Sequence, residues 1–149
     1  MKIIDADSKS AKDHPLLRAF VGLVEQTVGQ GVLDFTDLQS RPFMKFWQNL
    51  VIHRFDSASD DFRNIFWGTQ IGLMFGQDCT GKLLSEMGYG EAYDTIRDLD
   101  MQIINGERRI YASGTLFWQG REQRQWHQVK MPLQRNGRIN EVLFCADIS

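Results

Sequence analysis

Hydrophobic positions recur with the period of a helix in the first third of the chain and with the period of strands in much of the remainder. Asp13 is a residue type that caps helices, and Pro15 is tolerated in the first helical turn after it. Apolar residues then recur every three or four positions up to Gly29, where the helix is expected to end. This apolar stripe consists of Leu17, Phe20, Val21, Val24 and Val28. A second, shorter helix is expected from Ser40 onward.

From residue 50 the pattern changes to strands separated by turns and by two helices. Short runs rich in β-branched and aromatic residues, bounded by Gly, Ser, Asp or Asn, are typical of strands. The expected strands are residues 51–55, 62–67, 109–119, 125–134 and 139–148. Between the second and third of them, the apolar spacing predicts helices at 69–75 and 91–104. Asn136-Gly137 is a strong signal for a tight hairpin between the last two strands.

The order of these elements predicts an α+β fold. Five strands joined mainly by hairpins indicate a five-stranded antiparallel sheet covered on one face by helices, with an extra N-terminal helix. The chain then divides into a loose polar segment at 1–12, an N-terminal helical segment at 13–49, and the sheet domain at 50–149. With 149 residues, the chain is long enough for one such domain and its hydrophobic core.

Composition and charge argue against nucleic-acid binding, membrane insertion and cysteine-based frameworks. The 17 Lys and Arg against 19 Asp and Glu give a net charge of −2, so no basic excess is available to neutralise nucleic-acid phosphates. No apolar run approaches the roughly 20 residues that span a bilayer, and the N-terminus lacks the apolar centre of a signal peptide. We therefore expect a cytoplasmic protein that binds no nucleic acid and does not insert into membranes. Cys79 and Cys145 are too few for a disulfide framework or a four-cysteine zinc site.

The sequence shows no constellation of catalytic or metal-binding residues. Residues 76–83 come close to a phosphate-binding loop, but Leu83 stands where a Ser or Thr would bind magnesium. No His lies three to five residues from another His or a Cys, as a local metal pair requires. Asp98 and Asp100 are expected on a solvated helix face. We expect a non-enzymatic protein without a metal site, although a single His leaves axial ligation of a haem open.

Two stretches resemble PAS domains. In the first, a strand at 62–67 runs into Gly68-Thr69, a short helix and Gly76-Gln77-Asp78-Cys79-Thr80-Gly81-Lys82. This is similar to a bacterial PAS subgroup, in which a strand, Gly-Thr and a short helix precede Gly-Arg-Asp-Leu-Thr-Gly-Arg. The second stretch contains Met131-Pro132-Leu133, the Gly137 hairpin and the final Asp147-Ile148-Ser149. PAS domains commonly close with Pro-Leu, a Gly hairpin and Asp-Ile-Thr, so the resemblance covers about residues 50–149.

The resemblance implies a sensory or protein-interaction role and leaves the ligand open, because this fold carries haem, flavin, small acids or nothing. Cys79 invites comparison with the Gly-x-Asn-Cys-Arg-Phe-Leu-Gln string of light-sensing flavin domains. The Asn, Arg and Gln of that string are missing here, so no cofactor is assigned. No kinase, cyclase or DNA-binding output follows Ser149 in this sequence, and the expected output partner is an unidentified signalling protein.

We expect a small apolar or amphipathic ligand in a cavity between helices and sheet. The expected lining residues are Phe66, Ile71, Met74, Tyr93, Ile96, Arg97, Phe117, His127 and Met131. The polar members are His127 and Arg97, which is expected to pair with a ligand carboxylate or phosphate. The lining depends on strand facing, because a slip of one residue moves every side chain to the other face. The alternative is a ligand-free interaction or dimerisation scaffold, in which these residues form a filled core. A haem- or flavin-binding sensor is a further alternative.

The N-terminal stripe is expected at a homodimer interface. A helix of this length is marginal alone in water and needs its apolar face covered. Two covers are available, namely the protein's own sheet or the same helix of a second chain. PAS-like domains often use a flanking N-terminal helix in the second way, and two-fold symmetry would make the patch self-complementary. The expected interface residues are Leu17, Phe20, Val21, Val24 and Val28.

Overall fold

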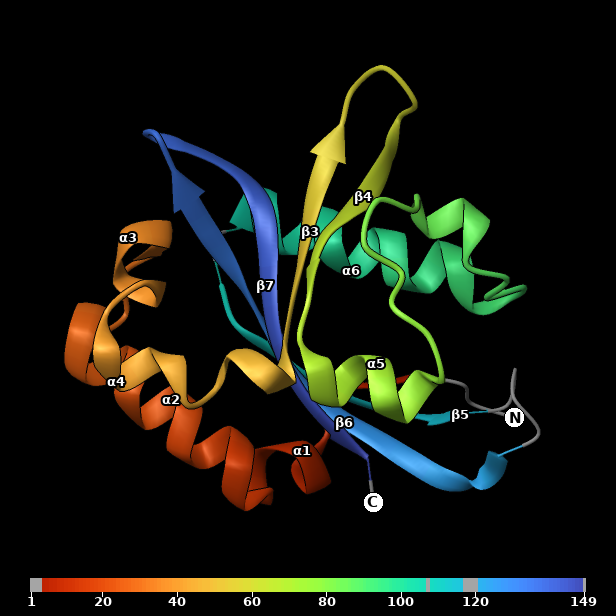
Figure 1. Ribbon diagram of the computed structural model, residues 1–149, viewed down its shortest axis with the longest axis horizontal. Helices are drawn as coiled ribbons and strands as arrows, with labels where there is room; N and C mark the ends of the chain where they lie inside the picture. Colours follow the sequence, from red (N-terminus) through yellow and green to blue (C-terminus); the bar gives the residue numbers. More distant parts are fainter. Residues whose placement is uncertain (1–3, 107, 117–120, 149) are drawn as a thin grey trace.

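The computed structural model describes residues 4–106, 108–116 and 121–148 (Figure 1). Its strands are β1 (Ile4–Ala6), β2 (Leu33–Asp34), β3 (Leu50–Asp56), β4 (Asp61–Trp67), β5 (Ile110–Leu116), β6 (Arg121–Arg135) and β7 (Arg138–Ile148). Its α-helices are α1 (Lys9–Asp13), α2 (Pro15–Val28), α3 (Phe35–Leu38), α4 (Arg41–Met44), α5 (Thr69–Phe75) and α6 (Ala92–Gly106), and two 3₁₀ helices are η1 (Trp47–Asn49) and η2 (Leu84–Glu86). None of the described helices is both long enough and apolar enough to cross a bilayer.

Within the described residues, all strands join one mixed sheet in the order β1-β5-β6-β7-β3-β4, and β2 adds a short parallel pairing to β6. The five long strands, β3 to β7, pair antiparallel and correspond to the five expected strands. Asn136 and Gly137 form the turn between β6 and β7 with φ of 52° and 75°. These positive φ values are those of the tight hairpin that the Asn-Gly pair predicts. The α+β class is therefore confirmed.

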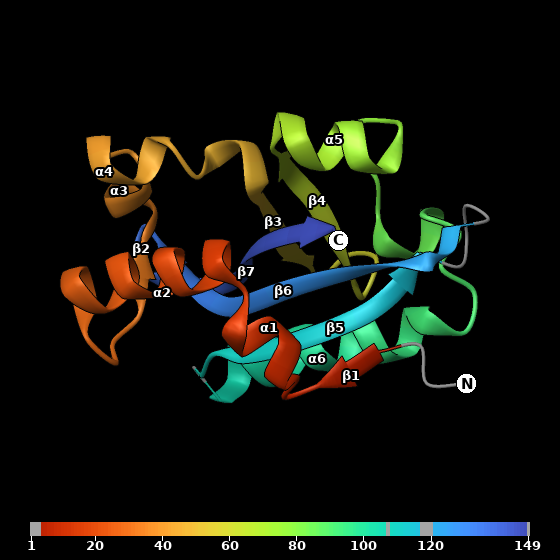
Figure 2. The ribbon, with the colours of Figure 1, turned by 90° about the horizontal axis from the view of Figure 1, so that it is seen from below.

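Side chains of the long strands point alternately to two faces of the sheet, and both faces are buried. On β6, Val129, Met131 and Leu133 join the core under α2, whereas Trp126 joins the core under α6. Pro15–Val28 and the short helices after it cover the first face. Figure 2 shows α1 and α2 on the opposite side of the sheet from α6. The expectation of helices on one face is wrong, because apolar residues on both faces require two covers.

The apolar stripe of α2 lies in the core of its own chain. Leu17, Phe20, Val21 and Val24 are buried against the sheet, and Val28 packs against the same cluster. In the structure, the sheet of the same chain covers the apolar face of this helix. The stripe that the sequence places at a dimer interface is therefore covered within its own chain, with Val28 half-buried.

The N-terminal segment is more ordered than its polar sequence suggests. In the described part of residues 1–12, β1 pairs with β5, and α1 follows immediately. The Ser8 hydroxyl accepts a hydrogen bond from the backbone of Ala11 and lies 2.7 Å from the Ser113 hydroxyl on β5. From residue 4 onward, the backbone and Ser8 therefore have partners on β5, which the local sequence does not reveal.

The backbone at Gly68 approaches its neighbours too closely for a side chain. Gly68 precedes α5, and its N–H donates to the carbonyl of Leu50 over 2.8 Å. A Cβ atom at this position would overlap the backbone oxygens of Trp47 and Gln48. The backbones of η1 and of the start of α5 are therefore in close contact here.

We expect Gly68→Ala to lower the free energy of unfolding by about 1–3 kcal/mol, because overpacking against backbone forces a shift. Gly72→Ala is the matched control within α5, since a Cβ there meets its nearest atom at an ordinary 3.6 Å. Replacing this helical glycine should raise stability slightly. Urea unfolding followed by tryptophan fluorescence measures both variants. Equal stability of the two proteins would contradict the close approach at Gly68.

Candidate functional site

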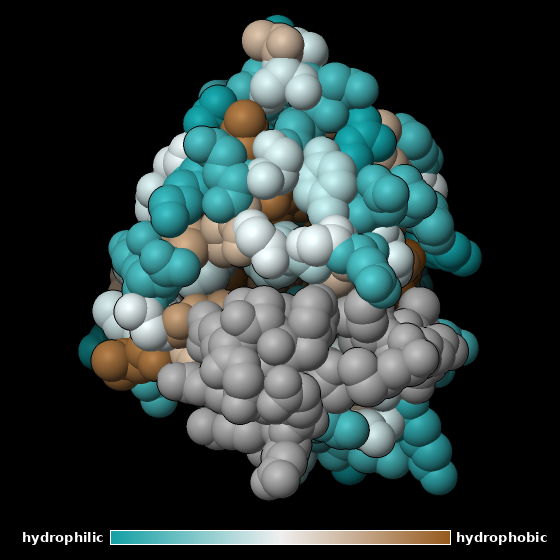
Figure 3. Space-filling model, turned by 90° about the vertical axis from the view of Figure 1, so that its right-hand side faces the viewer, coloured by the Kyte–Doolittle hydropathy of each residue, from teal (hydrophilic) through white to brown (hydrophobic). Residues whose placement is uncertain are grey.

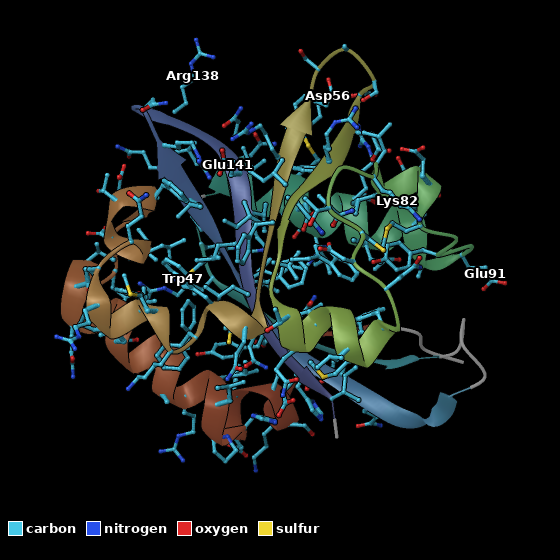
Figure 4. The ribbon with its side chains drawn as sticks, in the orientation of Figure 1. Trp47, Asp56, Lys82, Glu91, Arg138 and Glu141 are labelled. Atoms are coloured by element: carbon cyan, nitrogen blue, oxygen red, sulfur yellow. The ribbon has the colours of Figure 1, made fainter. Side chains whose placement is uncertain are left out.

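A cavity of about 50 Å³ lies between α5, α6 and the sheet. Side chains from these elements fill the surrounding space (Figure 4). The lining is mainly aliphatic and aromatic, and consists of Val51, His53, Trp67, Ile71, Met74, Phe75, Tyr89, Ile96, Trp126, Gln128, Lys130, Phe144, Ala146 and Ile148. On the side that carries the loop from α5 to α6, the visible surface is largely hydrophilic (Figure 3). An apolar interior with a few polar groups is the usual character of a small-molecule site.

Three ionisable side chains meet beside this cavity. Asp100 projects from α6 toward the sheet, where Oδ2 lies 2.7 Å from Nδ1 of His53 on β3. Its other oxygen, Oδ1, accepts a hydrogen bond of 2.7 Å from Nζ of Lys130 on β6. The exposed fractions of Asp100, Lys130 and His53 are 0%, 1% and 2%. The three residues form what we term the buried ion cluster.

The surroundings of Asp100 favour its ionised form. Burial alone raises the pKa of the Asp100 carboxyl, but the charge of Lys130, the electrostatic interaction with His53 and the hydrogen bonds from both residues outweigh it. The pKa therefore lies below its ordinary value, and Asp100 carries a negative charge at neutral pH. A buried charge is tolerated only when it is paired and hydrogen-bonded, and here both carboxylate oxygens have donors.

The aromatic ring of Phe144 contacts the two basic side chains of the cluster. Its centroid lies 4.8 Å from that of His53, with the rings edge to face, and 5.0 Å from Nζ of Lys130. Edge-to-face rings and a cation over a ring face are both favourable contacts. Phe144 thus packs against the two basic side chains of the cluster, and all three residues line the cavity.

Two buried nitrogen atoms at this cavity have no hydrogen-bond partner among the described residues. They are Nε2 of His53 and Nε1 of Trp126. Native proteins pair the great majority of their buried polar atoms, and an unpaired one requires an explanation. Both residues line the same cavity, so its wall contains two hydrogen-bonding side chains whose nitrogen atoms the described residues leave unpaired.

The structure places three of the nine expected site residues, Ile71, Met74 and Ile96, in the lining of the cavity. Tyr93 and Arg97 lie on α6 outside the lining, and Arg97 donates to the Asp60 carboxylate over 2.9 Å. Arg97 is therefore engaged at the turn after β3 and does not meet a ligand in this cavity. Phe117 lies outside the described residues.

The remaining three expected residues, Phe66, His127 and Met131, lie on the opposite face of the sheet. On β6, every second residue from Trp126 to Lys130 lines the cavity. His127 and Met131 occupy the alternate positions of this strand and lie on its other face. On β4, the pairing with β3 shifts at Ile52 and His53, which leaves Ile65 as an extra residue. Such a bulge reverses the alternation, so Trp67 lines the cavity instead of Phe66.

Sequence reasoning missed the buried ion cluster. Asp100 was expected in solvent, although it lies four residues after Ile96 and three before Ile103, on the apolar face of its helix. A carboxylate within an apolar helical stripe is a recognisable signal of a buried partner. Its partners His53 and Lys130 are 47 and 30 residues away from it, and no local pattern connects them.

His127 belongs to a second polar network, near α1 and α2. Its Nδ1 lies 2.8 Å from the Ser113 hydroxyl, and its ring centroid lies 5.6 Å from that of His14. Nε2 of His14 lies 3.3 Å from Oδ2 of Asp147, near the end of β7. Burial, followed by the neighbouring His14, lowers the pKa of His127 below its ordinary value, although Asp147 opposes the shift.

The described residues contain no group of three or more His, Cys, Asp or Glu side chains that could hold a metal ion. His53 supplies a single free nitrogen at the cavity, which is the minimum for an axial haem ligand. A volume of about 50 Å³ is far below that of sites for larger ligands, so a haem or flavin would require the walls to move apart. Comparisons with protein-family models, curated proteins and solved structures find no match for this chain.

We expect Asp100→Asn to lower the free energy of unfolding by about 3 kcal/mol, because it leaves the buried Lys130 without its counter-charge. Denaturant unfolding at pH 7.5 measures the loss. Asp60→Asn is the matched control, since it makes the same change at an exposed pair with Arg97 and its left-handed backbone suits Asn. The control should change stability little. Equal effects of the two substitutions would argue against the cluster.

The lowered pKa of His127 predicts a pH dependence of stability. The unfolded chain, with an ordinary histidine pKa of 6.5, binds the proton more readily than the folded chain. The contribution of His127 is therefore complete above pH 6.5 and declines as the pH falls below it. We expect unfolding free energies measured from pH 7.5 to 5.5 to fall less steeply for His127→Gln than for the unmodified protein. Parallel curves would contradict this assignment.

Proposed function

We propose that this chain is a non-enzymatic sensory or regulatory domain of the PAS type. In this proposal, a small molecule binds in the cavity between α5, α6 and the sheet, and an unidentified signalling protein receives the signal through surface contacts. The observation that carries the proposal is the apolar cavity in which two buried nitrogen atoms, His53 Nε2 and Trp126 Nε1, have no partner among the described residues.

The arrangement of the long strands supports the PAS part of the proposal. β3 to β7 pair antiparallel, and α5 and α6 are both inserted between β4 and β5. This matches the five-stranded antiparallel sheet that the resemblance over residues 50–149 implies. The cavity lies under those two helices, which are among the elements that enclose the cavity in PAS-like folds.

The polar groups at the cavity favour binding over catalysis. Lys130 and His53 are the basic side chains of the lining, and both are hydrogen-bonded to the same carboxylate of Asp100. Lys130 is engaged by Asp100, and the described residues that line the cavity include no Ser, Thr or Cys that could be a nucleophile with His53 as its base. The structure therefore supports recognition of a ligand better than its conversion.

Helix α5 offers a route from the cavity to the surface. It contributes Ile71, Met74 and Phe75 to the lining, whereas Leu73 on the same helix is 75% exposed. A ligand that displaces the inner side chains would move a helix whose outer face meets solvent. A homodimer remains part of the proposal, but it requires a surface other than the buried stripe of α2.

We expect Ala146→Leu to abolish ligand binding without unfolding the protein, because the larger side chain would occupy the cavity that Ala146 lines. Native mass spectrometry of the purified protein, followed by a thermal-shift screen of small metabolites, identifies a ligand for this comparison. Ala58→Leu is the matched control, because it adds the same atoms at an exposed turn. It should bind as the unmodified protein does.

The same measurements also distinguish the proposed sensor from a cofactor-binding sensor and from a ligand-free scaffold. An absorbance band of haem or flavin in the purified protein would favour the cofactor sensor. Absence of any bound or stabilising molecule would favour the ligand-free interaction scaffold. Ligand binding that survives Ala146→Leu unchanged would place the ligand outside this cavity and contradict the proposed site.

A further inference from the structure

The chemistry of the cavity specifies the kind of ligand, and this inference rests on the proposed ligand-binding function. Nε2 of His53 and Nε1 of Trp126 are both buried without a partner among the described residues, and both residues line the same cavity. The exposed fractions of His53 and Trp126 are 2% and 7%. A ligand gains affinity here only if it supplies hydrogen-bond partners for these two nitrogen atoms.

The hydrogen-bond role of Nε2 follows from the contact at the other nitrogen of the ring. Nδ1 of His53 lies 2.7 Å from Oδ2 of Asp100. An ionised carboxylate only accepts hydrogen bonds, so Nδ1 carries the hydrogen. In the neutral ring the lone pair is then on Nε2, which can only accept a hydrogen bond. Trp126 Nε1 carries a hydrogen and is a donor only.

The charge of the site follows from the same cluster. Lys130 and Asp100 form a buried pair of opposite charges, with Nζ and Oδ1 separated by 2.7 Å. With His53 neutral, the buried ion cluster has no net charge. An ionic ligand would bring an uncompensated charge into an apolar cavity, which is strongly unfavourable. An uncharged ligand avoids this penalty.

The volume limits the size of the ligand. About 50 Å³ is roughly a third of the ~150 Å³ of an apolar cavity known to admit benzene. A molecule of a few non-hydrogen atoms fits best, and Met74 gives the α5 wall some capacity to adapt to a slightly larger one.

We propose that this cavity selects a small, uncharged molecule with one hydrogen-bond donor and one acceptor. The donor of the ligand binds Nε2 of His53, and its acceptor binds the indole N–H of Trp126. Asp100 is a positioning residue in this arrangement, because it fixes the tautomer of His53 without touching the ligand. Lys130 keeps the site neutral.

Pyrazole and thiophene test the proposal. Both are compact five-membered aromatic rings that are uncharged at pH 7.5, but only pyrazole has an N–H donor and a ring nitrogen that accepts. We expect pyrazole to bind at least about tenfold more tightly than thiophene, as one to two newly satisfied buried groups imply. Titration of the ¹⁵N-labelled protein followed by NMR measures both dissociation constants, and the indole N–H signal of Trp126 should move with pyrazole alone.

Trp126→Phe removes the donor while it keeps an aromatic ring in the wall. This variant should lose most of the preference for pyrazole and should bind thiophene as before. Trp47→Phe is the matched control, because its indole donates to the Leu38 carbonyl outside the cavity. The preference should be unchanged in this control. Loss of preference in both variants would contradict the role of Trp126.

The tautomer of His53 is tested without any ligand. Long-range ¹H–¹⁵N correlation spectra distinguish a protonated from an unprotonated ring nitrogen. At pH 7.5 we expect Nδ1 protonated and Nε2 unprotonated. A hydrogen on Nε2, in either the other neutral tautomer or the imidazolium ion, would overturn the proposal even if Trp126→Phe failed to fold.

The possible failures are distinguishable. Equal affinity for thiophene and pyrazole would overturn the inference about ligand polarity and leave the proposed binding function intact. Acetate that binds at the cavity more tightly than pyrazole would overturn the requirement for an uncharged ligand. If neither ring perturbs the signals of cavity residues, and formamide, a smaller uncharged molecule with one donor group and one acceptor, does not perturb them either, small-molecule binding itself is contradicted and the inference falls with it.

Discussion

The interior of this protein depends on one buried carboxylate. Asp100 is the point at which α6, β3 and β6 meet, because its two oxygens bond to residues of the two strands. An apolar helix face packs in several registers at similar cost, but a charged group without exposure to water tolerates only the one in which it is paired. The cluster therefore fixes where α6 lies on the sheet, and with it the shape of the adjacent cavity.

The second constraint is that both faces of the sheet are apolar. Val129 and Met131 on β6 need a cover on one side, and Trp126 on the same strand needs one on the other. The helices that precede the sheet provide the first cover, and those inserted after β4 provide the second. The N-terminal third of the chain is thus an integral layer of the domain, and its apolar stripe forms part of the core.

The elements of this fold are predictable from the sequence, whereas the lining of its cavity is predictable only in part. Hydrophobic spacing and the Asn136-Gly137 turn indicate the long strands and helices, since these signals are local. Strand facing is set by contacts across the sheet. The bulge at Ile65 reverses β4 near its end, and the polar residues of β6 suggest a solvent face although Lys130 has a buried partner on α6. Both facts depend on residues far apart in the chain.

The close approach at Gly68 has a mechanical consequence for α5. The start of this helix is anchored, since Gly68 lies against the backbone of η1 and donates to Leu50 of β3. Its last residues, Met74 and Phe75, line the cavity and are followed by Gly76 in the left-handed conformation. Because the start of α5 is held at Gly68 and its end lines the cavity, a ligand that displaced Met74 or Phe75 would tilt the helix about Gly68. Such a tilt would carry exposed Leu73 with it.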